Sequence, residues 1–115
     1  MSDQVEIQLP KTRWNESDVF TATAYFRTRS SKAALAPTTV HYQVDCLTTH
    51  TPLQTLTSAS AAASVGLTMT AAINAIQSAD SSLETKQLIV IADKDLSTRA
   101  VGRVQWKVKN IHGVG

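Results

Sequence analysis

Hydrophobic and polar residues alternate along most of this chain with a period of two, as in a β-strand with one buried face. The clearest example is residues 38–46, where every second residue from Val40 to Cys46 is apolar and the residues between them are polar. Pro37 suits the start of this strand, because proline cannot donate a hydrogen bond to a sheet. Seven segments are predicted to be strands on this pattern: residues 5–9, 19–29, 38–46, 53–58, 65–71, 84–93 and 98–111.

Two stretches are less regular. In residues 53–58 the two leucines, Leu53 and Leu56, are unevenly spaced, and a β-bulge is expected to place both inward. Apolar residues in 71–83 approach a helical spacing, which predicts one or two turns with Ile76 at the edge of the core; a regular three-turn helix is the alternative. The Ala/Ser-rich residues 58–64 are predicted to be a loop, because they lack large apolar anchors.

About seven short strands without a strong helix predict an all-β fold, an immunoglobulin-like antiparallel β-sandwich, in a single domain over residues 1–115. A small barrel is the alternative. Trp106 and Tyr42 are expected to fill the middle of the core. Residues 11–18 are interpreted as a connection whose one large side chain, Trp14, is buried at the end of the core or contacts a partner.

Composition narrows the class of protein. The hydrophobic fraction of 43% is ordinary, and a net charge of +2 is far from the clustered basic field of a nucleic-acid-binding protein. Cys46 is the one cysteine, so no internal disulfide forms, and it is expected to be a small buried side chain. No apolar run is long enough to cross a membrane, and the first residues do not resemble a signal peptide, so folding in a reducing cytoplasm is expected.

Candidate chemistry is sparse. His41, His50 and His112 lack the spacing of a metal site, and Asp93 with Asp95 is interpreted as turn chemistry, since the glycine and further carboxylate of a calcium loop are missing. No phosphate-binding loop, nucleophile elbow or zinc-protease motif is present. We therefore expect no enzymatic activity, no cofactor and no small-molecule substrate.

The candidate functional residues are surface positions on the last two strands. Residues 84–93 are apolar on both faces, so Ile89 and Ile91 point away from the core side defined by Leu88, and such a face is either central or covered from outside the domain. The following strand carries an outward cationic row. These cations form either a solvated face that prevents mispairing or part of a binding surface: Arg103, Lys107 and Lys109.

With the strands placed, the chain resembles small immunoglobulin-like proteins encoded among the structural genes of tailed bacteriophages. The resemblance covers residues 20–111. It is carried by TTVHYQVD (38–45), the strand at 53–58, the alternating residues of 65–69, NAIQ (74–77), ETKQ (84–87) and the alternating residues of 88–92.

The resemblance implies a non-enzymatic virion component that is made in the host cytoplasm, chiefly a capsid decoration or head accessory subunit present in many copies. A head-tail connector or tail accessory subunit is the alternative. The expected partners are other virion proteins and further copies of the chain, with no nucleic acid and no membrane. A carbohydrate-binding sandwich is a second class; it would use exposed aromatic side chains, for which Tyr25 and Trp14 are the candidates.

Overall fold

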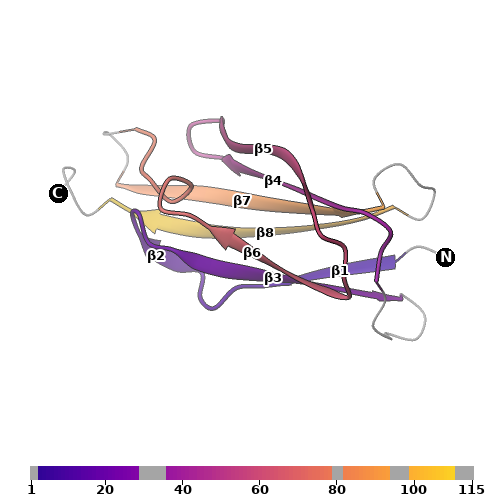
Figure 1. Ribbon diagram of the computed structural model, residues 1–115. Coiled ribbons are helices and arrows are strands. Elements are labelled where there is room, and N and C mark those ends of the chain that lie inside the picture. The colour runs from indigo at the N-terminus through magenta and orange to yellow at the C-terminus, as the bar shows by residue number, and fades with distance from the viewer. Residues whose placement is uncertain (1–2, 29–35, 79–81, 94–98, 111–115) are drawn as a thin grey trace.

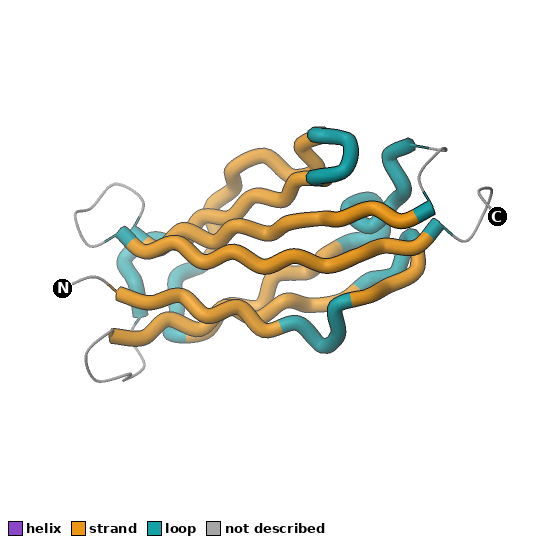
Figure 2. Tube along the Cα trace, turned by 180° about the vertical axis from the view of Figure 1, so that it is seen from behind, coloured by secondary structure: helices purple, strands orange, loops and turns teal. Residues whose placement is uncertain are grey.

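The computed structural model describes residues 3–28, 36–78, 82–93 and 99–110, and these form an elongated all-β structure (Figures 1 and 2). Among these residues there is no helix that is long and apolar enough to cross a membrane. The strands are β1 (Asp3–Gln8), β2 (Arg13–Asn15), β3 (Phe20–Thr28), β4 (Val40–Cys46), β5 (Thr51–Ala59), β6 (Ser64–Met69), β7 (Leu83–Ala92) and β8 (Ala100–Lys109).

The strands form two sheets packed face to face. One sheet has three strands in the order β1-β3-β6, and the other has five in the order β2-β8-β7-β4-β5. Neither order closes on itself, so the arrangement is a sandwich and not a barrel. The chain crosses between the sheets in the manner of an immunoglobulin-like fold, which confirms the predicted fold class.

The short strand β2 was not predicted, and it pairs in parallel with the end of β8, whereas the other pairings between described strands are antiparallel. Backbone hydrogen bonds hold both of its ends, from Lys107 N to Thr12 O (2.8 Å) and from Glu16 N to Lys109 O (2.9 Å). Between them the half-buried Trp14 stacks on Phe20 with a ring separation of 4.3 Å. A three-residue strand with one apolar residue has too little alternation to be recognised in a sequence, although the inward role expected for Trp14 is confirmed.

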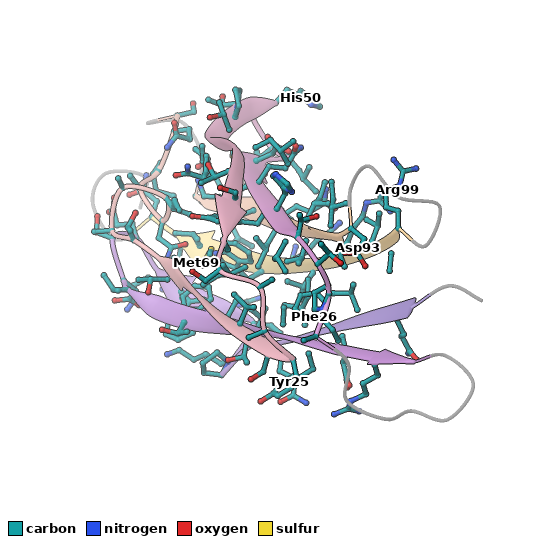
Figure 3. The ribbon with its side chains drawn as sticks, turned by 45° about the vertical axis from the view of Figure 1, so that its right-hand side comes forward. Tyr25, Phe26, His50, Met69, Asp93 and Arg99 are labelled. Carbon is teal, nitrogen blue, oxygen red and sulfur yellow. The ribbon has the colours of Figure 1, made fainter. Side chains whose placement is uncertain are left out.

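The core lies between the sheets and consists of the inward residues of the alternating pattern. Figure 3 shows Phe26 from β3 and Met69 from β6 between the two layers, and both are at most 1% exposed. Cys46 is fully buried, as expected, whereas Tyr42 only packs against the core from a half-buried position. The apolar residues of β4, β7 and β8 with 0% exposure are Val44, Cys46, Leu88, Val90, Ala92 and Val108.

Residues 71–74 and the β4–β5 pairing have the predicted structure, whereas Leu56 does not have the predicted burial. Residues 71–74 form turns, with Ile73 buried and Ile76 packed against the core, so no three-turn helix is present there. The β4–β5 pairing contains the expected irregularity near Val44. The bulge buries only part of the predicted pair, however, because Leu53 packs on the core while Leu56 remains 42% exposed.

A glycine on β8 allows the two sheets to approach along one side. A Cβ atom at Gly102 would lie 2.8 Å from Val5 Cγ1 and 3.2 Å from Val5 O, so only glycine lets β1 rest on β8 at this point. On β3, the strand next to β1, the small residues Ala22 and Ala24 are also fully buried. Small side chains at these positions therefore allow β1 and β8 to lie close together at Gly102.

The burial of Trp106 gives a test of the β8 register. Trp106 is 1% exposed, packs edge-to-face on Phe20 and donates a 2.8 Å hydrogen bond to Asn74 Oδ1. We expect Trp106→Ala to lower the free energy of unfolding by about 3 to 5 kcal/mol in urea denaturation, because it leaves a cavity. The exposed neighbour Lys107→Ala should change it by no more than about 0.5 kcal/mol. Equal effects at the two positions would contradict the register.

Candidate functional site

The predicted interface residues all lie on one surface, the side of the five-stranded sheet that points away from the three-stranded sheet. We call this surface the outer face and define it by the apolar residues Ile89, Ile91 and Val101 and the cations Arg103, Lys107 and Lys109. In β7 and β8 every second residue faces the core, all of them buried except the half-buried Val104, and the residues between them point outward. The structure therefore brings together the two groups that the sequence had placed on separate strands.

Strand register sets the spacing of the apolar part. Ile89 lies directly opposite Arg103, and Ile91 lies opposite Val101. Both isoleucines are half-buried by their neighbours, whereas Val101 is 41% exposed. The apolar side chains thus form a small continuous patch at one end of the outer face, in contact with solvent.

The cations form the other part. Lys107 and Lys109 are exposed, and β2 adds Arg13, which lies opposite Lys107 in the parallel pair. Arg13 was missed because nothing in the sequence shows that this connection returns to β8. A groove of about 300 Å³ lies beside these cations, lined by Thr12, Arg13, Thr85, Gln105, Trp106 and Lys107.

One polar atom near the isoleucines lacks a partner. His41 lies on β4 opposite Ile91, and its Nδ1 is buried without a hydrogen bond among the described residues. An unpaired buried nitrogen is costly.

The second notable cluster is inside the sandwich and was not predicted. Glu84 and Lys86 share the inward side of β7 with Leu88, and both side chains are fully buried. Lys86 Nζ lies 3.0 Å from Glu84 Oε1 and donates to Ala75 O at 2.9 Å. The Glu84 carboxylate also accepts hydrogen bonds from the backbone N–H groups of Gln77 (2.8 Å) and Ser78 (2.9 Å).

A neighbouring amide extends this network across the end of the core. Asn74 is fully buried; its Oδ1 accepts from Trp106, and its Nδ2 donates to Asp18 O at 2.7 Å. The Cys46 thiol lies 3.7 Å from Glu84 Oε1. Each side chain of the network thus has a polar partner, and together they fasten residues 74–78 to β7 and β8.

The charge of Glu84 follows from these contacts. Burial by itself would raise the pKa of Glu84, but the backbone N–H of Gln77, the Lys86 ammonium and the N–H of Ser78 outweigh it and lower the pKa below its ordinary value. Glu84 is therefore a carboxylate at neutral pH. Because the carboxylate, Lys86 and Cys46 are enclosed at 0% exposure, this cluster stabilises the fold and is closed to a substrate.

The residues considered for metal binding do not come together. Within the described ranges no group of three histidine, cysteine or acidic side chains is placed to hold a metal ion. The Asp93 carboxylate instead accepts hydrogen bonds from the backbone N–H of Thr38 (2.7 Å) and Thr39 (3.2 Å). These are long-range contacts that hold the residues before β4 beside the end of β7. The rest of the turn predicted at residues 93–97, including Asp95, lies outside the described residues, as does His112.

Comparison with known proteins bears on the fold. No family model and no curated protein matches the chain. Among solved structures, a conjugative transposon lipoprotein from Bacteroides eggerthii superposes with a TM-score of 0.53 at 12% identity, over 90% of this chain and 95% of the lipoprotein. At that identity the likeness concerns the fold alone.

The buried ion pair makes a strong prediction. Glu84→Gln keeps an acceptor oxygen for only one of the backbone N–H groups of Gln77 and Ser78 and turns an amide NH2 toward the other. It also leaves the Lys86 ammonium buried without a counter-charge, and the change should lower the free energy of unfolding by about 3 to 5 kcal/mol. Adding Lys86→Met should recover much of this loss, since it removes the uncompensated charge. Urea denaturation measures both. A double variant no more stable than Glu84→Gln would contradict this role of the charge.

The lowered pKa of Glu84 also predicts a pH dependence. A carboxyl group with a lower pKa in the folded than in the unfolded state stabilises the fold above the unfolded value, about 4.3, and loses that contribution as pH falls through the folded value. The stability difference between wild type and Glu84→Gln should therefore be constant from pH 6 to 7 and shrink below about pH 4. Denaturation midpoints at a series of pH values measure it, and a difference unchanged at low pH would contradict the assignment.

Proposed function

We propose that this protein is a non-enzymatic structural subunit of a tailed-bacteriophage particle, a capsid decoration or head accessory protein, and that it binds another virion protein through the outer face. The observation that carries the proposal is the outward pair Ile89 and Ile91 on an exposed sheet, next to a row of cations. The resemblance of residues 20–111 to phage immunoglobulin-like proteins supports the class of particle.

The outer face has the chemistry of a modest protein-binding surface. An apolar centre excludes water on association, and a charged rim selects the partner and its orientation. Here Ile89, Ile91 and Val101 supply the centre, and the cations Arg13, Arg103 and Lys107 lie on one side of it. The complementary surface on the partner would be apolar with an acidic border.

A carbohydrate-binding role has less support. Trp14 is committed to stacking on Phe20 at 4.3 Å, which removes it from any sugar-binding platform. Of the two aromatic candidates this leaves Tyr25, on the outer surface of the three-stranded sheet beside Arg27. A single aromatic ring gives little of the convergent surface that sugar recognition uses.

The proposal is tested first by locating the protein. A gene situated beside portal, capsid or tail genes, and the chain itself in mass spectra of purified particles of the encoding phage, are the expected results. Absence of the wild-type chain from those particles would overturn the proposal.

The outer face is tested by a double substitution. Ile89→Asp with Ile91→Asp should leave a folded protein that is no longer incorporated into particles, because two carboxylates replace the apolar centre. The matched control adds the same charge to the exposed outer surface of the other sheet, Gln8→Asp with Thr21→Asp, and should be incorporated normally.

Circular dichroism establishes that both double variants are folded. Normal incorporation of a folded Ile89→Asp, Ile91→Asp variant would move the interface away from the isoleucines. Loss of folding in that variant would assign the pair to the core and overturn its role as an interface.

A further inference from the structure

Each sheet of the sandwich has two edge strands, β1 and β6 in one and β2 and β5 in the other. An edge strand presents unpaired backbone N–H and C=O groups, and proteins protect such edges with charges, proline or bulges. Residues 46–79, which contain β5 and β6, include no aspartate, glutamate, lysine or arginine. These two edges therefore lack the commonest protection.

The β5 edge is protected by other means. Its pairing with β4 is irregular near Val44, and Pro52 removes one donor from the strand. The Thr57 hydroxyl donates to Thr55 O at 2.7 Å, which occupies a backbone acceptor. A bulged strand of this kind is a poor template for another strand.

The β6 edge is regular and open. All six residues of β6 pair with β3 in an unbroken register, from Ser64 opposite Tyr25 to Met69 opposite Phe20. Phe26 N donates to Ala63 O, which begins the ladder. Hydrogen-bonding direction alternates along an antiparallel strand, so the backbone groups of Ser64, Gly66 and Thr68 point away from β3. No described strand lies on that side of β6 (Figure 1).

We propose that β6 pairs antiparallel with β6 of a second copy of this chain, across a two-fold axis at Gly66, joining two three-stranded sheets into one of six strands. In this register Gly66 lies opposite the second copy's Gly66, and Ser64 lies opposite the second copy's Thr68. Each of these pairs exchanges two backbone hydrogen bonds. The outward side chains that meet are small and exposed.

The second copy is favoured over a different partner by charge. A two-fold contact places every side chain near its own equivalent, so an edge with one charge sign repels itself. The strand β2 carries Arg13 next to Lys107, which would oppose such a contact. Edge β1 has its Glu6 in an ion pair with Arg27, 3.2 Å apart, and a two-fold pairing would bring like charges together there also. Strand β6 has no charge to oppose its own pairing.

The contact does not depend on the outer face or on a virion role, because it uses only the backbone of one sheet edge. A single pair of six-residue strands buries little surface, so the dimer is expected to be concentration-dependent. Sedimentation of the purified full chain should show monomer at micromolar and dimer at near-millimolar concentration. A monomer throughout that range would overturn the proposal.

Two substitutions of Thr68 distinguish the contribution of its backbone N–H to dimerisation from that of its side chain. Thr68→Pro removes the outward N–H but no hydrogen bond to β3, so a folded variant should dimerise about 10- to 100-fold more weakly, with two hydrogen bonds lost per dimer. Thr68→Val keeps the N–H and the branched shape, and should dimerise like wild type. Equal dimerisation of the folded proline variant would overturn the proposal.

Cysteine substitutions test the register independently of the proline variant. Gly66→Cys places two thiols opposite each other at a Cα separation of about 5.5 Å, which a disulfide spans. Its new Cβ lies 3.3 Å from the methyl group of exposed Thr21, which can shift. Mild oxidation should give a covalent dimer with Gly66→Cys and not with the equally exposed Ser64→Cys. Cross-linking of both to the same extent, or of neither, would overturn the two-fold register.

Discussion

The polar network around Glu84 is the constraint on which one end of the sandwich depends. A carboxylate and an ammonium are placed between two sheets at 0% exposure, where an unpartnered charge would be strongly destabilising. Two backbone N–H groups, one backbone carbonyl and the ion pair compensate that cost. Because the backbone partners all come from residues 75–78, the network holds this segment against the inward side of β7.

Alternation predicted the fold because each long strand has one buried side. Alternation also indicates the buried ion pair, which was not predicted. Glu84 and Lys86 are four and two residues before Leu88 on the same strand, so they face inward with it. Charged residues are almost never fully buried without partners, so composition contradicted the periodicity at these two positions, and their partners lie on a distant turn. Strand β2 could not be predicted for a different reason: its pairing with β8 is long-range and parallel, and no local pattern encodes it.

Part of the candidate interface was also predicted from the alternation of apolar and polar residues. Ile89 and Ile91 stand out because a strand that is apolar on both sides is unusual, and the cations of β8 share the parity of exposed positions. Their assembly into one surface required the register, which sets Arg103 against Ile89. The open edge of β6 is invisible to pattern analysis, because whether a strand has one neighbour or two is a property of the sheet.

The outer face and the β6 edge lie on different sheets, so occupation of one leaves the other accessible. The two proposed contacts, with a copy of the chain along a sheet edge and with a different protein on a sheet face, are therefore compatible with each other. Because a two-fold contact closes on itself, the proposed β6 pairing would give a dimer with two outer faces, one on each copy.

The parallel pairing of β2 with β8 has a mechanical consequence. Strand β1 begins at one end of the long axis, and strand β8 ends at the other end (Figure 1). A force that pulls the chain ends apart would draw β2 and β8 past each other along their length, and the ladder between them would resist as a unit and not open bond by bond. The nearby contact of Val5 on Gly102 would have to slide at the same time. A pull along the long axis of the domain would thus load this ladder in shear.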